Sequence, residues 1–478
     1  MKKFLVLSAL FVSFLAQTFA SNAYRIEVEI DGFEGDTLYL GFYYGNNQYL
    51  KDTAALNTQT RSFVFEGEET LNSGVYMVVL PPDNRFFQIH VDQDQEFSLK
   101  TKLDALTASM EIKGSKDNEL LYEYLNYLAA QKPKAEALQA ELQAAASDKE
   151  KEKAQKALDQ LNEEVLAYQK KLVSEHANSI TAAIIKANLP LDIPEYEGEE
   201  QETQIKRWRW MQKNYFNMID LTDERLVRTP FLFERVDYFV NKLQLQHPDT
   251  IKQAIDYVLE KMRPAEETFK YYLIHFLNHY AQSKIVGMDA VYVHIVDQYY
   301  AKGIADWTDE EQLQKIIENA NELKPLLIGK TAPDIRLQDK EGKAYNLHDI
   351  DSEYTILYFW RYDCGHCKKS TPHMKEFYEK YKEKGVKLVA VCVKFTKDIP
   401  DCWKYVEENE IGDWMHLVDP YHRSKFSTIY NIKTTPQMYI LDKNKEIISK
   451  RIGAEQLEEV MDKIIEMNKK EKESQQGE

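Results

Sequence analysis

The sequence predicts a multidomain protein with an N-terminal β-sandwich, an all-α middle region and a C-terminal α/β domain. Two changes in the spacing of apolar residues support this division. The period is two up to about residue 112, helical from about residue 117 to 324, and mixed beyond Pro325. A chain of 478 residues with 44% hydrophobic residues can bury more than one core. Four cysteines cannot staple a chain of this length, so packing must supply its stability.

Residues 1–20 have the pattern of a secretory signal peptide. Lys2 and Lys3 precede an apolar run over residues 4–15, and Ala20 ends the segment. A transmembrane anchor is the alternative, but the run is short for one, and no nearby cysteine could carry a lipid. We therefore expect export to the periplasm as a soluble protein without a stable membrane anchor. The formal charge of -17 argues against nucleic acid and anionic lipid headgroups as partners.

Residues 21–114 should form the β-sandwich. Short stretches alternate apolar and polar residues and are separated by turn residues, as in an antiparallel sandwich. The predicted strands cover residues 24–30, 37–44, 61–66, 74–80, 86–91 and 95–100. Tyr43, Tyr44 and Phe87 either line a binding face or pack into the sandwich, and packing is the favoured interpretation.

Residues 115–325 should be helical. Apolar positions between residues 154 and 172 step by four and three, and Ser147-Asp148-Lys149-Glu150 has the form of a capping box. We predict an antiparallel helical hairpin over residues 134–172, with Pro133 interrupting the first helix. One continuous projecting helix is the alternative.

Three histidines in this helical region are candidate metal ligands. His275 and His279 are four residues apart, and His294 follows. Spacing fixes no third ligand, and aromatic residues surround the pair in the sequence. We therefore predict that these rings pack, and we predict no metal.

Residues 326–468 alternate strands and helices. The predicted strands are 355–359, 386–393, 437–441 and 446–452, and the helices are 364–384, 400–409 and 454–468, which leaves 469–478 as a frayed polar tail. The motif Cys364-Gly365-His366-Cys367 lies where the first strand passes into the first helix. A strand-to-helix turn with Cys-x-x-Cys is typical of redox chemistry.

The position of the motif assigns a role to each sulfur. Cys364 should attack, because the positive end of the helix dipole and the unpaired N–H groups favour a thiolate there. Cys367, one turn on, should be the resolving thiol. Gly365 and His366 set how well the reduced form is stabilised, and a protonated His366 would make the pair more oxidising.

A structural disulfide and half of a zinc site are the alternative explanations of the motif. The two remaining cysteines, Cys392 and Cys402, are too far apart to complete a zinc ribbon. We expect these two to be buried thiols rather than a second disulfide.

Residues 329–468 resemble the thioredoxin-fold thiol-disulfide oxidoreductases of the TlpA/ResA type, within the redoxin superfamily. The resemblance rests on residues 329–335, on Asp339 with Gly342-Lys343, on Tyr358-Phe359-Trp360, and on Thr434-Thr435-Pro436. The β-rich and helical regions are similar to domains of unknown function that precede such redox domains.

The family resemblance carries expectations for individual residues. It implies a cis peptide bond before Pro436, which with Thr435 would hold the client backbone, and it implies that Trp360 packs under the site. The family often has a glutamate, thought to move protons for the second thiol, where this chain has Ser370. His366 or Asp363 would have to take over that role.

The sequence therefore predicts an exported thiol-disulfide oxidoreductase with a thioredoxin-fold C-terminal domain. Its dithiol would exchange disulfides with envelope protein clients through a mixed disulfide, without a cofactor, and an envelope partner would recycle it. A client-binding scaffold with an auxiliary redox domain is the alternative. A peroxidase is disfavoured, because Tyr362-Asp363 precede Cys364 in place of the Thr-x-x-Cys context of a peroxidatic cysteine. The direction of exchange, the clients and the oligomeric state stay open.

Overall fold

The computed structural model describes residues 23–476, and the chain divides into two compact units. The first unit contains residues up to Phe239 together with Lys261–Thr268, and the second contains Val240–Glu260 and Phe269 onwards. The predicted signal peptide lies outside the described residues. Within them, no helix combines the length and apolar character needed to cross a membrane.

The first unit begins with one eight-stranded sheet, in the order β6-β5-β2-β3-β4-β1-β7-β8. The strands are β1 Tyr24–Asp31, β2 Thr37–Tyr44, β3 Asn47–Asn57, β4 Ser62–Gly67, β5 Gly74–Leu80, β6 Arg85–Val91, β7 Glu96–Lys102 and β8 Glu111–Lys113. The long strand β3 pairs with β2 along most of its length and with β4 at its end. Both halves of the sheet therefore close over one apolar core.

That core contains side chains from each half of the sheet, such as Ile26 and Phe65 from one half and Leu38 and Val78 from the other. The prediction of a β-rich N-terminal domain is confirmed. Tyr43 and Phe87 are buried, so packing describes these two aromatic rings. The sequence prediction missed β3, because this strand is exposed along most of its length and lacks the apolar alternation of its neighbours.

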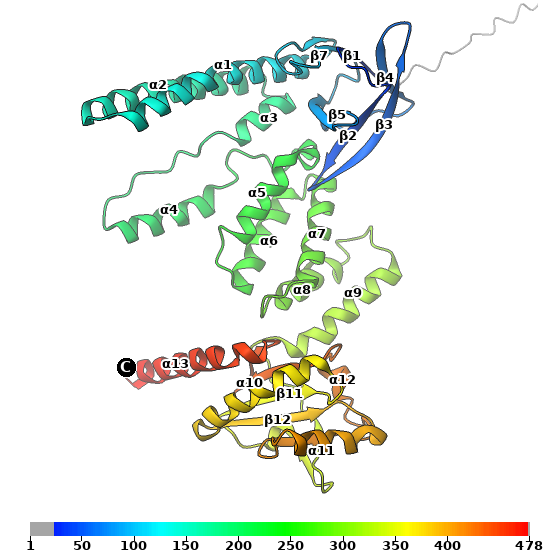
Figure 1. The fold of residues 1–478 in the computed structure, drawn as a ribbon, viewed down its shortest axis with the longest axis vertical. Coiled ribbons are helices and arrows are strands. Elements are labelled where there is room, and N and C mark those ends of the chain that lie inside the picture. Colours follow the sequence, from blue (N-terminus) through cyan, green and yellow to red (C-terminus); the bar gives the residue numbers. More distant parts are fainter. Residues whose placement is uncertain (1–22, 477–478) are drawn as a thin grey trace, which may run out of the picture. The chain divides into compact units, whose positions relative to one another are not determined.

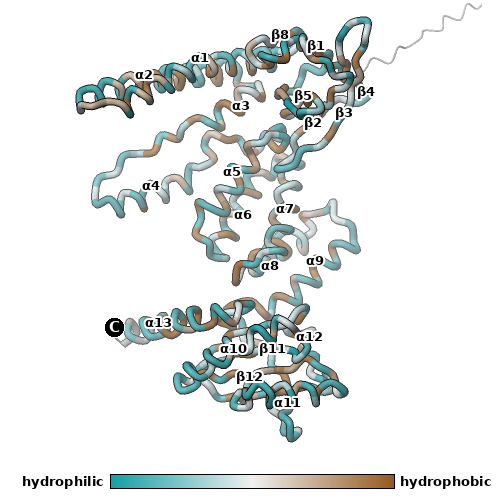
Figure 2. Tube along the Cα trace, in the orientation of Figure 1, coloured by the Kyte–Doolittle hydropathy of each residue, from teal (hydrophilic) through white to brown (hydrophobic). Residues whose placement is uncertain are grey.

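Helices α1 Lys116–Ala144 and α2 Asp148–Glu175 form an antiparallel hairpin (Figure 1). The capping box at Ser147 and Glu150 starts the second helix. Tyr127 and Tyr168 stack across the pair, and hydrophilic and hydrophobic residues are mixed along both helices (Figure 2). Pro133 lies inside α1 and does not end it, so the expected interruption is wrong.

The remaining helices of the middle region are shorter. They are α3 Ile180–Ala187, α4 Glu200–Asn214, α5 Pro230–Asn241, α6 Pro248–Met262, α7 Glu266–Ala281, α8 Asp289–Ile295 and α9 Glu310–Leu323. The all-α prediction for this region is confirmed. In this region His294 forms a hydrogen bond of 2.8 Å with Asp256, and the rings of His275 and His279 are 6.0 Å apart.

The C-terminal domain, in the second unit, has a seven-stranded sheet in the order β10-β9-β13-β12-β11-β14-β15. The strands are β9 Arg336–Gln338, β10 Ala344–Asn346, β11 Tyr354–Trp360, β12 Val386–Cys392, β13 Met415–Val418, β14 Gln437–Leu441 and β15 Ile447–Lys450. Its helices are α10 Gly365–Tyr381, α11 Ile399–Glu408, α12 Phe426–Ile429 and α13 Leu457–Gln476. The predicted α/β thioredoxin-type fold is confirmed.

Strand β11 is buried at every position because it lies in the middle of this sheet. It runs parallel to β12 and antiparallel to β14. Its C-terminal end therefore lies at the same edge of the sheet as the start of β14, which brings the Cys-x-x-Cys turn and the Pro436 loop together. Helix α13 continues to Gln476, so most of the expected frayed tail is helical.

Candidate active site

Cys364 is the N-cap residue of α10, directly after the turn that follows β11. Its Sγ accepts a hydrogen bond of 3.3 Å from the backbone N–H of Cys367. A helix N-terminus has N–H groups without helical partners, and here one of them points at sulfur. Cys364 is partly exposed and Cys367 is 1% exposed, and both are free thiols.

The two sulfurs differ in acidity. Burial pushes the pKa of Cys364 upward, but hydrogen bonds from the Cys367 thiol and from the backbone N–H groups of Cys367 and His366 outweigh it and lower that pKa below its ordinary value. Burial raises the pKa of Cys367 to about 12, and the neighbouring Cys364 adds to this shift. The exposed thiol is therefore the acidic one, as an attacking sulfur must be.

His366 contributes through its backbone. Among the described residues, no hydrogen bond joins the imidazole to either cysteine, and the side chain is exposed in the cavity beside the motif. The imidazolium effect expected from the sequence stays a prediction. Gly365 has open space where a Cβ would stand, so no close contact demands glycine at this position.

Thr435 contacts the Cys364 sulfur and is followed by Pro436. The Cys364 thiol donates a hydrogen bond of 3.2 Å to the carbonyl oxygen of Thr435, and the Thr435–Pro436 peptide bond is cis. Both residues line the cavity that also receives His366. Trp360 is 3% exposed and shares the core that contains Cys367, with its ring 5.3 Å from that of Tyr405.

Asp363 is unsuited to carry protons for the second thiol. Its carboxylate accepts hydrogen bonds of 3.0 and 3.1 Å from Arg361 and one of 2.7 Å from Lys394. These bonds, the one from Arg361 first, hold the pKa of Asp363 well below its usual range, so the group stays ionised at neutral pH.

The structure adds Tyr358 to the residues that surround the buried thiol. Burial, and then the charge of Cys367, raises the pKa of Tyr358 far above its ordinary value. The phenol therefore stays neutral, and its buried oxygen has no hydrogen-bond partner among the described residues. Tyr358 belongs to the Tyr358-Phe359-Trp360 motif, but its position in a buried strand looks like ordinary packing from the sequence alone.

The expectation of two buried thiols at Cys392 and Cys402 is wrong. They form a disulfide between the end of β12 and the first turn of α11, with a Cα–Cα distance of 6.5 Å. Both residues are almost completely buried. This disulfide is shielded from solvent, whereas the Cys364 thiol is accessible.

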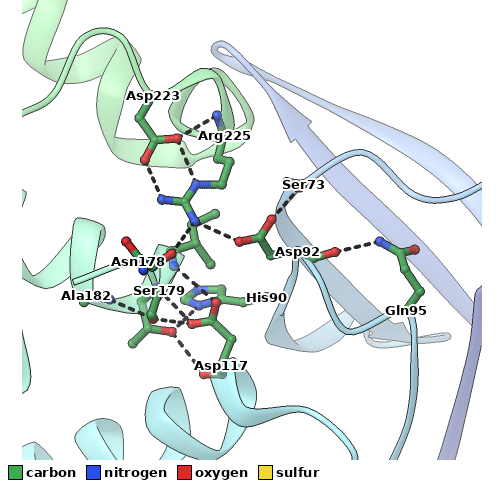
Figure 3. A network of polar contacts seen from close by, with 12 residues as sticks. Ser73, His90, Asp92, Gln95, Asp117, Asn178, Ser179, Ala182, Asp223 and Arg225 are labelled. Atoms are coloured by element: carbon green, nitrogen blue, oxygen red, sulfur yellow. Dashed lines mark hydrogen bonds and ion pairs between the residues drawn. The ribbon is translucent and has the colours of Figure 1, made fainter. Parts of the chain in front are cut away.

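A second polar cluster, in the first unit, has the residue types of a hydrolase but not their arrangement (Figure 3). The His90 ring forms a hydrogen bond of 2.7 Å with the Thr181 hydroxyl. The Asp117 carboxylate accepts hydrogen bonds from the Ser179 hydroxyl and from the backbone N–H of Thr181. Within residues 23–476 no hydrogen bond joins His90 to Ser179. A Ser-His-Asp mechanism needs the base to bond the nucleophile, so this cluster joins α1 and α3 to the sheet instead.

The same cluster extends to a charged group beside the sheet. Arg225 donates hydrogen bonds to Asp223 at 2.8 and 2.7 Å and to Asp92 at 2.8 Å, and Figure 3 shows its guanidinium between the two carboxylates. One guanidinium thus pairs with two carboxylates, and all three charged groups are hydrogen-bonded. We therefore interpret the polar cluster as structural: it links segments of the first unit.

Family models match three consecutive parts of the chain. Residues 24–121 match a domain of unknown function (DUF4369), residues 145–322 match another (DUF5106), and residues 328–450 match the AhpC/TSA family. A thioredoxin-type fold with an accessible, acidic Cys-x-x-Cys thiol defines a thiol-disulfide oxidoreductase.

Curated relatives identify the branch. The chain is 33% identical over 140 residues to the thiol-disulfide oxidoreductase ResA of Bacillus cereus, an alignment that covers 29% of this chain and 78% of the relative. It is 30% identical over 140 residues to ResA of Geobacillus kaustophilus, with the same coverage. The chain therefore belongs, through its C-terminal domain, to the ResA family of thiol-disulfide oxidoreductases.

Solved structures give further similarities. A domain of a possible thiol-disulfide isomerase from Cytophaga hutchinsonii is 35% identical, with a TM-score of 0.29, and the match covers 31% of this chain and 99% of that one. A thioredoxin-like protein from Bacteroides caccae is 17% identical, with a TM-score of 0.43, and the match covers 57% of this chain and 98% of that one.

Proposed function

We propose that the Cys364/Cys367 dithiol exchanges disulfides with protein clients through a mixed disulfide. The observation that carries this proposal is the asymmetry of the pair: an accessible sulfur with a lowered pKa, followed one turn later by a buried sulfur with a raised one. A low pKa raises the fraction of attacking thiolate, and a buried partner cannot react before the client is held in place.

The reaction in the reducing direction has two steps. The Cys364 thiolate attacks one sulfur of the client disulfide, so a Cys364–client S–S bond forms and the other client sulfur leaves as a thiolate. Cys367 then loses its proton and attacks Cys364, which forms the Cys364–Cys367 disulfide and releases the second client thiolate. The client gains two electrons and the dithiol loses two, and the same steps run backwards oxidise a client dithiol.

Neighbouring residues support each step. The backbone N–H groups at the start of α10 stabilise the Cys364 thiolate, and the neutral phenol of Tyr358 is a neighbour that feels the charge of Cys367. Thr435 accepts a hydrogen bond from Cys364, and both Thr435 and Pro436 line the cavity where an extended client segment would pass. Trp360 packs in the same core as Cys367.

The setting of this reaction is also part of the proposal. The Lys2-Lys3 start and the apolar run at residues 4–15 favour export to the periplasm. There the protein would meet the disulfides of envelope proteins and would need an envelope redox partner to restore its dithiol.

Trapping tests the proposal. Cys367→Ser should accumulate mixed disulfides through Cys364 on a non-reducing gel, because attack still occurs and resolution does not. Cys364→Ser is the matched control and should trap nothing and abolish turnover. If neither variant traps a client and a strain with both substitutions keeps its envelope thiol proteome unchanged, the exchange mechanism is wrong and a client-binding scaffold with an auxiliary redox domain replaces it.

A further inference from the structure

The cavity beside Cys364 has an unusual charge. Its volume is about 810 Å³, and its walls come from α10, from the loop that precedes β14 and from the segment that follows β15. Three cations line it, Lys369, Lys433 and Arg451, and Glu455 is its one carboxylate. This concentration of positive charge occurs in a chain whose formal net charge is -17.

The three cations are available to a ligand. Lys369, Lys433 and Arg451 are exposed, and within the described part of the chain none of them forms a side-chain hydrogen bond or an ion pair. Arg451 has a left-handed backbone conformation, with φ of 56°, at the point where the chain leaves β15. That turn directs the chain along the cavity wall instead of continuing the sheet.

The opposite charge next to the motif is already neutralised. Asp363, the residue before Cys364, is held by Arg361 and Lys394. A client that approaches Cys364 therefore meets three cations without partners, the single cavity carboxylate of Glu455, and the carboxylate of Asp363, which has two partners. The N-terminus of α10 adds its own positive potential at the same place.

We infer that the cavity selects client segments with Asp or Glu beside the cysteine that Cys364 attacks, bound through Lys369, Lys433 and Arg451. This inference rests on the proposed disulfide exchange and names its substrate class. The clients are acidic polypeptides, and their backbone would lie along the cavity wall that Thr435 and Pro436 form. Local charges of this kind act mainly on the rate of productive encounter, and they are screened by salt.

The sign of the expected effect makes the test sharp. The chain as a whole is acidic, so its long-range field alone would favour a basic client. Two synthetic peptides would be compared, each with one internal disulfide and identical except for Glu or Lys on both sides of the first cysteine. The full-length protein would be reduced first, and the rate constant for its reduction of each peptide would be measured by stopped-flow tryptophan fluorescence.

The Glu peptide should react about 10-fold faster than the Lys peptide at low ionic strength. The ratio should fall towards one in about 1 M NaCl, where the Debye length is about 3 Å. Lys433→Glu should lower or invert the ratio, and Lys369→Glu is a second variant on a different segment. Comparing two peptides within each variant removes any general change in the reactivity of Cys364.

Lys443→Glu is the matched control. Lys443 is exposed in the turn after β14, at the end of the sheet opposite Cys364, and it does not line the cavity. This variant makes the same charge change and should keep the ratio of the unmodified protein. Equal rates for both peptides, or an equal loss of preference in the Lys433 and Lys443 variants, would overturn the inference and leave disulfide exchange standing. Failure to reduce either peptide would overturn both.

Discussion

The buried ion pair between Lys450 and Asp289 provides the most quantitative prediction. Lys450, the last residue of β15, is 2% exposed, and its Nζ donates to the Asp289 carboxylate at the start of α8 and to the carbonyl oxygen of Leu326. Burial lowers the pKa of Lys450, and the charge of Asp289 opposes that shift. Asp289 therefore stabilises the charged form of the buried Lys450 amine.

Asp289→Ala removes the partner and leaves the buried ammonium with one carbonyl acceptor. Breaking a buried pair in this way costs about 3 to 5 kcal/mol. The low end applies here, because the Asp289 side chain is 14% exposed and therefore already partly hydrated. A loss of about 3 kcal/mol corresponds to a fall of about 1.5 M in the urea midpoint when the m-value is about 2 kcal/mol/M.

The assay is urea unfolding of the full chain, followed by tryptophan fluorescence and by protection of the buried Cys367 thiol from alkylation. The second probe reports on the C-terminal domain alone. Lys450→Met with Asp289→Leu removes both charges and should recover most of the loss, since apolar replacement of a buried pair is often neutral. A shift below about 1 kcal/mol for Asp289→Ala, or no recovery in the double variant, would refute this account of the pair.

The same pair bears on the domain boundary proposed at residue 326. A fragment of residues 326–468 has the full set of strands around Cys364 but lacks Asp289. It should fold and reduce insulin, as an independent thioredoxin-type domain, but with about 3 kcal/mol less stability than residues 240–478. Equal stability of the two fragments would show that the ion pair contributes nothing there, and an inactive short fragment would show that the boundary is wrong.

Three further predictions concern single groups. His366→Pro removes both the imidazole and a backbone N–H that bonds the Cys364 sulfur. It should raise the pKa of Cys364 by about one unit in a thiolate-absorbance titration. His366→Ala keeps the N–H, so it measures the effect of the imidazole alone. Burial lowers the pKa of His90 to about 4 from about 6.5, so as the pH falls the unfolded chain binds a proton at this residue before the folded chain does. The stability of the first unit should therefore fall by about 2 kcal/mol between pH 7 and pH 5 in denaturation experiments. His90→Gln should lack this dependence on pH. Replacing both Cys392 and Cys402 by Ala opens a loop with a sequence separation of 10 and should cost about 3 kcal/mol of stability. Insulin reduction should remain, because Cys364 and Cys367 are still present as the exchanging dithiol.

The motif that organises the site was predictable because its signals are local. A buried apolar strand, a Cys-x-x-Cys turn and a helix-prone segment follow one another within about thirty residues, and the structure has Cys364 as N-cap of α10, directly after β11. The missed strands lack such signals. Strand β3 is exposed along most of its length, and β13, with four residues, is too short to show a period.

Contacts between distant segments could not be predicted from the same pattern. Cys392 and Cys402 pair because β12 ends where α11 begins its first turn, which no spacing rule supplies. Asp92 and Arg225 are 133 residues apart in sequence, and their ion pair depends on how the segments fold together. Sequence patterns set which residues face inward, whereas tertiary packing sets which of them meet.

The end of β15 shows how the middle region takes part in the candidate site. Lys450 and Arg451 are adjacent in sequence, but Lys450 points into the unit towards Asp289 while Arg451 lines the cavity beside Pro436. The left-handed backbone at Arg451 makes that change of direction, and the buried pair fixes the strand end from which the turn starts. Asp289 therefore supports the position of a cation that the client would meet, although it is separated from Cys364 by 75 residues of sequence. Helix α8 has no redox residue of its own, but its contact with the end of β15 helps to place the charge of Arg451 in the cavity wall.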